Sequence, residues 1–379
     1  PETGKWKLNG MKRFITNGCA KVHLVLARPE EGTKDGRGLS MFVCESGPNL
    51  KVRRIEEKLG IHGSPTCELQ YNDVEAELVG SRRRGLTRYV MSLMNGARVA
   101  ISSQAVGIAE AAYRAARDYA AAREQFGATI ENFPAVYEML INSKVNISAA
   151  RTLLYETTKY VDLRDVYEHL VEHGDGEEVT KEDKAKSKLY TKIAAVLTPL
   201  SKALSTEMAN KVSYDSLQIH GGTGYMKDFN IERYCRDARI TNIYEGTTQL
   251  QHVAAIGGVT QRVLEPLMEE LSQLPYHGKL RRLANSVDGA RQKLNSAIKS
   301  ALEREDNEYL NLMTRRLCAA ETVVFVSYLM LRDALKDPER EVLVERYVLD
   351  NVPVAELDCE VVMSGELSVI DERDKILAM

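Results

Sequence analysis

Apolar and polar residues alternate over short stretches in the first 80 residues of the chain. Alternation with a period of two, bounded by turn-forming residues, is typical of half-buried β-strands. Glycine-containing turns separate the stretches, among them Asn9-Gly10, Asn17-Gly18 and Gly47-Pro48. The pattern predicts an antiparallel sheet or small barrel, with strands at residues 6–9, 23–28, 39–45, 50–56 and 67–71.

The pattern changes at Gly85, where apolar residues begin to recur at helical spacing among Ala, Leu, Met, Arg and Glu. Four long helices are predicted, separated by short connections, as in an antiparallel helical bundle. The connector 172–183 is acidic and contains glycine, which predicts a solvated loop between two of them. The predicted helices cover residues 88–122, 133–172, 181–218 and 243–256.

The last third of the chain is again helical in pattern, with predicted helices at 259–273, 279–304, 308–336 and 338–349. Pro353 is expected to end the last of these, and the final ~25 residues look weakly organised. The predicted fold class is α+β: an antiparallel β-domain, then an α-helical bundle, then a further C-terminal helical domain. The expected boundaries are 1–82, 83–257 and 258–379.

Composition narrows the class of protein. The 379 residues carry a formal net charge of -3, which argues against a nucleic-acid or membrane-surface binder because no broad positive field is present. The sequence contains no apolar run long enough to cross a bilayer. Its six cysteines form no C-x-x-C pair, which favours reduced, mostly buried thiols in an intracellular protein and no bound metal.

Three motifs follow one another late in the bundle: Gln218-Ile-His-Gly-Gly-Thr-Gly-Tyr225, Arg236-Asp-Ala-Arg239 and Ile243-Tyr-Glu-Gly-Thr-Thr-Gln249. Paired glycines after a helix allow close approach of a ligand such as a pyrophosphate, but they also occur at plain helix ends. Glu245 stands among apolar neighbours beside Gly246. From these residues alone it is either a helix N-cap or a general base.

The order and spacing of these motifs resemble the acyl-CoA dehydrogenase family, over residues 1 to about 256. Further matching segments are Lys12-Arg-Phe-Ile-Thr16, Met94-Asn-Gly-Ala-Arg98 and Tyr119-Ala-Ala-Ala-Arg123-Glu-Gln125-Phe126-Gly127. The resemblance implies that Glu245 is the catalytic base and that Asn95, Arg98 and Gly246 bind substrate. It implies FAD contacts from Phe14, Ile15, Thr16, Arg123, Gln125, Phe126, Gln218, His220, Gly221, Gly222, Thr247 and Gln249.

Each of these residues also has a purely structural interpretation. Thr16 could satisfy a neighbouring strand, and Arg123 could form a salt bridge on a helix face. His220 is interpreted as a packing residue whose backbone touches the cofactor. Arg236, Asp237 and Arg239 are expected to form a buried ion-pair network that positions the Glu245 loop.

The sequence also departs from the family's pattern. The chain opens at Pro1 without Met, and neither the family's N-terminal helical domain nor its Tyr-x-x-Thr-Glu-Pro segment is present. An incomplete catalytic unit is therefore expected, with its upstream part preceding Pro1. The usual Phe-Gln is Phe133-Pro134 here, so a flavin contact from that glutamine is not expected.

The implied activity is FAD-dependent α,β-dehydrogenation of acyl-CoA to trans-2-enoyl-CoA in fatty-acid β-oxidation. Electron-transfer flavoprotein is the implied acceptor, in a homodimer or dimer of dimers. The appended helical region and Leu197-Thr-Pro-Leu-Ser-Lys202 most resemble the bacterial methylmercaptopropionyl-CoA dehydrogenase group, which suggests a bacterial cytoplasm, with mitochondria as the alternative. A non-dehydrogenating flavin-binding relative and an oxidase on the same scaffold are the competing functions.

Overall fold

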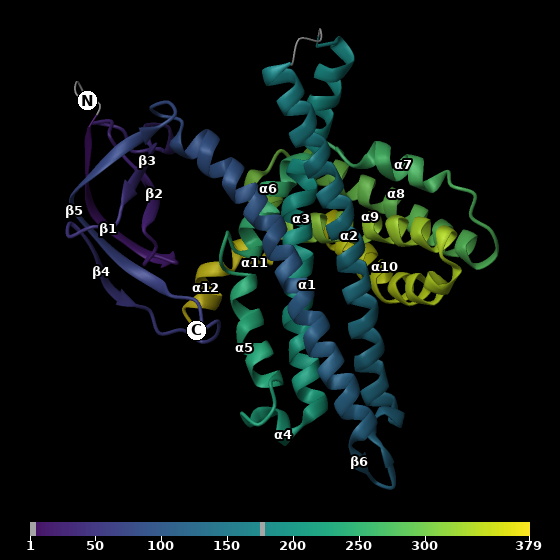
Figure 1. Cartoon of the computed structure of the whole chain (residues 1–379). Coiled ribbons are helices and arrows are strands. Elements are labelled where there is room, and N and C mark those ends of the chain that lie inside the picture. The colour runs from purple at the N-terminus through teal and green to yellow at the C-terminus, as the bar shows by residue number, and fades with distance from the viewer. Residues whose placement is uncertain (1–4, 175–178) are drawn as a thin grey trace. The chain divides into compact units, whose positions relative to one another are not determined.

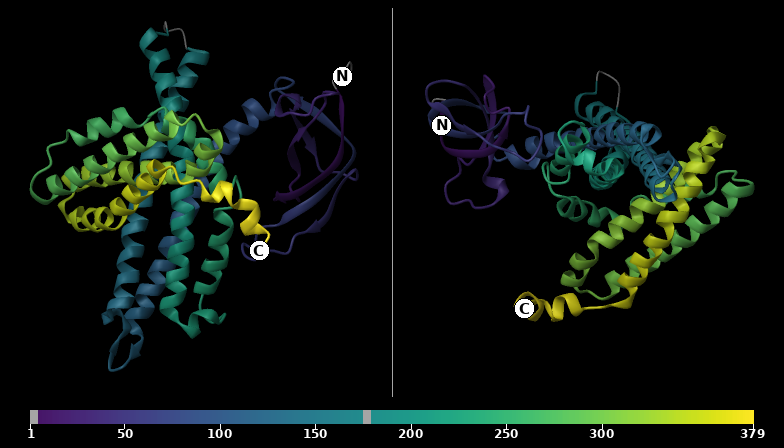
Figure 2. Two further views of the ribbon diagram at one scale, coloured as in Figure 1. Left: turned by 180° about the vertical axis from the view of Figure 1, so that it is seen from behind. Right: turned by 90° about the horizontal axis from the view of Figure 1, so that it is seen from below.

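The computed structural model describes residues 5–174 and 179–379 (Figures 1 and 2). The opening Pro1-Glu-Thr-Gly and part of the predicted acidic loop, residues 175–178, lie outside the described residues. The chain divides into two compact units, residues 1–97 and residues 98–379. The predicted three-domain division, with boundaries near 82 and 257, stays a prediction.

The first unit is an antiparallel β-structure, as the alternating pattern predicts. The strand order is β1-β5-β3-β2, and β4 pairs with β5. All the strand pairs of this sheet are antiparallel, for example Trp6↔Ala76 and Leu26↔Met41. The strands are β1 (Trp6–Thr16), β2 (Val22–Ala27), β3 (Ser40–Glu45), β4 (Leu50–Ile55) and β5 (Thr66–Val79).

The turn predicted at Asn9-Gly10 is wrong, because β1 runs straight through it. The register with β5 shifts between Leu8 and Gly10, and Gly10 takes a φ of 131°. A glycine inside a strand can mark a bulge as well as a turn, and here it marks the bulge. The Asn9 amide donates a 2.9 Å hydrogen bond to the Asp73 carboxylate, which fastens the irregular point to the neighbouring strand.

The second unit is built from long helices around α3 (Lys181–His220). A capping box of Thr180 and Asp183 starts this helix, and Gly221, at a φ of 59°, ends it. Around it lie α1 (Met91–Ala122), which crosses the boundary between the units, α2 (Pro134–His173), α4 (Gly222–Tyr225), α5 (Ile231–Thr241) and α6 (Thr248–Thr260).

The C-terminal helices pack against the bundle in the same unit. Helices α8, α9 and α10 lie side by side (Figure 2). One hydrophobic core contains Leu153 of α2, Leu197 of α3, Val259 of α6 and Leu317 of α9. The C-terminal elements are α7 (Glu265–Ser272), α8 (Gly278–Glu303), α9 (Asn307–Lys336), η4 (Pro338–Arg340), α10 (Glu341–Ser364), α11 (Ser368–Asp371) and α12 (Arg373–Leu377).

The expected stop at Pro353 is wrong: α10 continues through it to Ser364. Pro353 is exposed, so the backbone carbonyl that it leaves without a helical partner can bond to water. Val352, Ala355 and Cys359 are buried on the opposite face and keep the helix packed on α8 and α9. The final residues are helical as well, contrary to the expectation of weak order.

The interior shared by the bundle and the C-terminal helices yields a stability prediction. Leu317 is fully buried in it. Leu317→Ala should lower the free energy of unfolding by about 2–5 kcal/mol, because the deletion leaves a cavity that both sets of helices line. Denaturant unfolding followed by circular dichroism measures this loss. Leu357→Ala on α10, where the side chain is 57 % exposed, is the control and should change stability by less than about 0.5 kcal/mol. Equal effects would contradict a shared core.

Candidate active site

The motif Ile243 to Gln249 forms a tight turn between two helices. Helix α5 ends at Thr241, and α6 begins at Thr248 with Thr247 as its N-cap. The helix predicted from residue 243 therefore starts later, and Glu245 is not the cap residue. Glu245 and Gly246 both have positive φ, 53° and 93°. A non-glycine residue in this region is strained and often marks a functional site.

The backbone carbonyls of the turn are held by two buried side chains that sequence reasoning missed. The amide of Gln251 donates to the carbonyl oxygens of Glu245 and Gly246, at 3.1 and 2.9 Å. Lys202 Nζ donates to the Gly246 carbonyl oxygen at 2.6 Å. Both side chains have no solvent exposure. The two peptide units that follow Glu245 are therefore fixed from inside the protein.

The two ends of the turn are joined through one carboxylate. Glu207 of α3 accepts a hydrogen bond from Asn242 Nδ2 at 3.0 Å and one from Thr248 Oγ1 at 2.5 Å. Arg239 donates to the side-chain oxygen of Asn242 from the preceding helix. Arg239 is exposed and contacts the turn through this amide, so it does not belong to a buried ion-pair network as predicted, and Arg236 pairs with Glu232 within α5.

Charges and a phenol surround the Glu245 carboxylate. Arg98 of α1 is buried, and burial lowers its pKa while the Glu245 charge raises it. Tyr244 donates its hydroxyl to the Gln104 side chain of α1. Burial is the main cause that raises the pKa of Tyr244 to about 12, so this phenol stays a donor at neutral pH. The Glu245 residue is thus half-buried, within electrostatic reach of the Arg98 and Lys202 cations.

A second group of predicted residues gathers where α3 ends, at the end of the bundle that also carries α4 and β6 (Figure 1). His220 is buried, and its ring stacks on Tyr119 of α1 with 4.4 Å between ring centroids. Its Nδ1 donates to the Ser216 carbonyl at 2.7 Å, and burial lowers its pKa. His220 is therefore a neutral packing residue, as predicted. Gln218, Gly221 and Gly222 are exposed beside it.

This end of the bundle contains a hollow of about 610 Å³. Tyr119, His220 and Phe229 supply its aromatic wall, and Arg123 stands at its rim. The Arg123 guanidinium is exposed and makes no hydrogen bond or ion pair with any described residue. The predicted alternative, a helix-face salt bridge, is therefore wrong for the described part of the chain. An unpaired cation beside a hollow suits an anionic ligand.

Gln125 and Phe126 lie directly after α1, in a small hairpin of β6 (Glu124–Gln125) and β7 (Ala128–Thr129). Phe126 is 94 % exposed and has a positive φ of 51°. A large aromatic ring with so much exposed surface is suited to contact a partner molecule. The hairpin presents it on the same segment as Arg123.

The remaining predicted residues lie in β1, at the start of α1 and at the start of α6. Phe14, Ile15 and Thr16 end β1, and Phe14 is 66 % exposed with a positive φ of 62°. Asn95 lies in the first turns of α1 and is half-buried. Thr247 accepts a hydrogen bond from the Leu250 backbone, and Gln249 is exposed at the start of α6.

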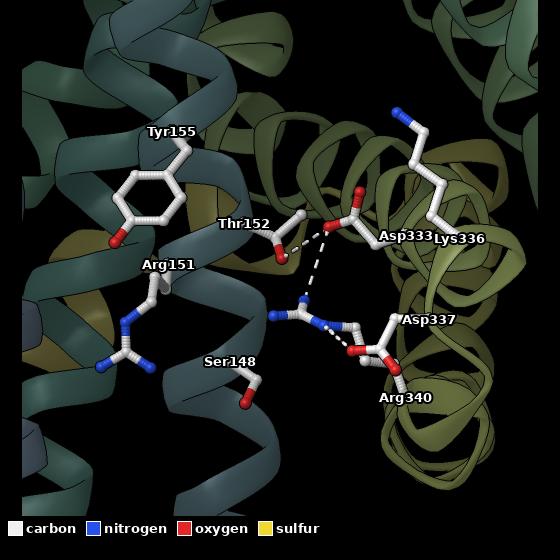
Figure 3. A pocket seen from close by; sticks show the side chains of 8 residues that line it. All are labelled: Ser148, Arg151, Thr152, Tyr155, Asp333, Lys336, Asp337 and Arg340. Atoms are coloured by element: carbon white, nitrogen blue, oxygen red, sulfur yellow. Dashed lines mark hydrogen bonds and ion pairs between the residues drawn. The ribbon is translucent and has the colours of Figure 1, made fainter.

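A separate hollow of about 280 Å³ lies between α2 and the α9–η4 corner (Figure 3). Most of its charged groups are paired, because Arg340 lies between Asp333 and Asp337, and Arg151 pairs with Glu110. Thr152 donates to Asp333 across it at 3.3 Å. This hydrogen bond joins α2 to α9 across the hollow.

Residues 5–174 and 179–379 contain no cluster of three or more His, Cys, Asp or Glu side chains that could hold a metal ion. Within the same ranges, no helix combines the length and apolar character needed to cross a membrane.

Three family models match the chain. The acyl-CoA dehydrogenase middle domain matches residues 1–74, its C-terminal domain matches 99–249, and a model described as acyl-CoA dehydrogenase C terminal matches 261–344. The chain therefore belongs to the acyl-CoA dehydrogenase family. The predicted family and fold class are confirmed, and the match extends into the appended helical region.

Individual relatives agree with this assignment. The chain is 36 % identical to an acyl-CoA dehydrogenase of Bacillus subtilis, over 66 % of this chain and 60 % of the relative. It is 35 % identical to the 3-methylmercaptopropionyl-CoA dehydrogenase of Ruegeria pomeroyi, over 66 % and 44 %. An acyl-CoA dehydrogenase from Bacillus anthracis, solved with FAD, shares the fold with a TM-score of 0.80 at 22 % identity, over 96 % of this chain and 65 % of that one. The chain spans about 60 % of the length of the first curated relatives that it matches.

The conformation of the turn yields a prediction about Gly246. An added Cβ there would lie 2.8 Å from Gln251 Nε2, at a φ that side chains rarely adopt. Gly246→Ala should therefore displace the Gln251 amide and lower the free energy of unfolding by about 1–3 kcal/mol. Gly257→Ala in α6 is the matched control, since its Cβ meets no atom within 4 Å. This control should be neutral or slightly stabilising, and the midpoints of thermal unfolding distinguish the two variants.

Proposed function

We propose that this chain forms the catalytic part of an FAD-dependent dehydrogenase that oxidises acyl-CoA thioesters to trans-2-enoyl-CoA in fatty-acid metabolism. The observation that carries the proposal is the Glu245 turn. A carboxylate stands on a strained backbone next to a residue without a side chain, and buried groups fix both of the following carbonyls. Such a turn can present a base and a backbone N–H to the same small group.

Glu245 takes the α-proton of the thioester. Its backbone N–H donates to the thioester oxygen, where negative charge develops as the proton leaves. Gly246 leaves room for the thioester to approach, while Asn95 and Arg98 bind the rest of the substrate. A bound FAD would supply the two-electron acceptor for the β-hydrogen, as hydride to flavin N5.

The residues present suit an FAD. The unpaired Arg123 beside the hollow can bind a pyrophosphate, together with the backbone at Gly221 and Gly222 and the exposed Gln125, Phe126 and Gln218. In the other unit, the exposed Phe14, with Ile15 and Thr16, can hold the flavin ring. Thr247 and Gln249 complete the proposed contacts at the start of α6.

The spacing of the two groups supports a homodimer or a dimer of dimers. Lys202, which contacts the Glu245 turn, and His220 are 18 residues apart on α3, or about 27 Å along the helix. The short ribityl chain of one flavin does not bridge that length. The Arg123 end of each chain is therefore proposed to bind the FAD of a neighbouring subunit. The proposed electron acceptor is electron-transfer flavoprotein, in a bacterial cytoplasm.

Substitution of the base tests the reaction. In the complete protein, Glu245→Gln should keep FAD and bind acyl-CoA, because size and polarity are preserved. Reduction of the flavin under anaerobic conditions should slow by at least ~10²–10⁴-fold, because the general base is lost. Stopped-flow bleaching with a panel of acyl-CoAs measures this rate.

Glu305→Gln is the matched control, since Glu305 is a glutamate at a similar positive φ of 54° in another loop. It should reduce at the rate of the unsubstituted protein. Normal bleaching by Glu245→Gln would remove Glu245 as the base. Rapid reoxidation of the reduced protein in air would favour the oxidase alternative.

The proposed role of Arg123 has its own test. Arg123→Ala should lower flavin occupancy and weaken the dimer together, because the cation is proposed to bind the neighbour's pyrophosphate. Absorbance at flavin wavelengths and analytical ultracentrifugation measure the two effects. Arg114→Ala removes an arginine that pairs with Glu110 on α1, the helix that precedes Arg123, and it should change neither. Loss of flavin with an unchanged dimer would limit Arg123 to its own subunit's cofactor.

A further inference from the structure

Lys202 is buried without any exposed surface, although it lies in the middle of the long helix α3. A lysine this deep is unusual, because removing an ammonium from water is costly unless the charge is used. Its neighbours on the helix are buried and uncharged, among them Ser201, Ala203 and Ser205. The hydrogen-bond partner of the Lys202 ammonium therefore indicates what the buried charge does.

The Lys202 ammonium donates a hydrogen bond to the Gly246 carbonyl oxygen over 2.6 Å. A charged donor at this distance from a carbonyl makes one of the stronger types of protein hydrogen bond. The charged groups that act on Lys202 come from three elements: Arg98 of α1, Glu207 of α3 and Glu245 of the turn. The ammonium thus lies within the electrostatic reach of the proposed base.

Lys202 and Gln251 act on the turn from different helices. Gln251 reaches both carbonyls from α6, the helix that the turn leads into. Lys202 reaches from α3, a helix 28 residues or more before the turn's own helix in the chain, whose first half is anchored in the large core. The Lys202 bond therefore ties the centre of the turn to a second helix of the unit.

We propose that Lys202 is a positioning residue for the reaction: its buried ammonium holds the Gly246 carbonyl and so keeps Glu245 in the left-handed conformation that presents its N–H and carboxylate to the thioester. This inference rests on the proposed function. Gly246 has no side chain that could anchor the turn. Its backbone carbonyl is therefore the group through which Lys202 can hold the turn.

The ionisation of Lys202 agrees with this geometry. Burial is the main cause that lowers its pKa, to about 8, and repulsion from Arg98 adds to the effect, whereas Glu207 and Glu245 raise the pKa. Below about pH 8 the ammonium is the dominant form in the folded protein. Above that pH the bond to Gly246 loses its charge assistance, so positioning should weaken as pH rises through this value.

Lys202→Met tests the proposal, because methionine fills most of the volume but donates no hydrogen bond. Lys211→Met is the matched control on the same helix, where the lysine side chain is 70 % exposed. The first measurement is amide hydrogen exchange of residues 242–248, which does not depend on flavin or on activity. Lys202→Met should speed exchange in this turn by about 10- to 100-fold, with no such change in Lys211→Met.

The second measurement is made on the complete, flavin-loaded protein. Lys202→Met should slow flavin reduction by acyl-CoA by about 10- to 100-fold, while the flavin content and the dissociation constant of a non-oxidisable acyl-CoA analogue stay unchanged. The unsubstituted protein should lose reduction rate as pH rises through about 8, and the variant should lack this step. If Lys202→Met does not fold, Lys202→Gln, which keeps a shorter uncharged donor, is expected to show the same effects in weaker form.

Unchanged exchange in the turn would overturn the proposal, as would a loss of substrate affinity without a loss of reduction rate. Failure of the proposed dehydrogenation gives a different result. In that case the unsubstituted protein would not be reduced by any acyl-CoA, whereas the exchange measurement would still report whether Lys202 holds the turn.

Discussion

Residue 245 has to hold a left-handed backbone while carrying a carboxylate, and the surrounding helices are organised around that constraint. A side chain in this conformation costs roughly 1–2 kcal/mol. Such strain persists only where the surroundings over-determine the conformation. Here Lys202, Gln251 and Glu207 fix the centre and both ends of the turn. The cost is shared by three contacts from the two helices α3 and α6, so no single contact has to offset it.

Helix α3 carries two of these three contacts, and its own packing explains why it can. Its first half, with Ile193 and Leu197, belongs to the core that includes α8, α9 and α10. Its second half, with Met208 and Val212, packs with α1, α2 and α5. Lys202 lies where the two cores meet. The C-terminal helices therefore stiffen α3, the helix that holds the turn. Through α3 they are physically connected to the site.

The sequence predicted the fold class and the strands and helices with regular periodicity, because burial patterns follow directly from apolar spacing. The predictions were wrong at residues that are compatible with two local structures. Gly10 was predicted to form a turn but lies at a β-bulge. Pro353 was predicted to end a helix but occupies an exposed position within one. Helix α5 was missed because its sequence, Ile-Glu-Arg-Tyr-Cys-Arg-Asp, is mostly polar.

The proposed base and the cofactor motifs were found from their local order, but the residues that hold the turn were not. Lys202, Glu207 and Gln251 precede or follow Glu245 by up to 43 residues, and nothing local distinguishes them from surface side chains. The one available indication was that Lys202 interrupts a segment, residues 193–206, that is otherwise uncharged. That signal shows that a lysine is buried, but it does not name the carbonyl that it binds.

Two arginines, one on α1 and one directly after it, show how two regions of the bundle differ. Arg98 lies on α1, and Arg123 follows its last residue, 25 residues further along the chain and about 37 Å along the helix axis. Arg98 is buried, and the charge that acts on it is Glu245 of the same chain. Arg123 is exposed beside an open hollow and has no partner among the described residues. Near Arg98 the buried Lys202 holds the protein's own turn, so its charge is already used within the protein. Arg123 is left in water at the far end of α1 and keeps its charge for an anion from outside.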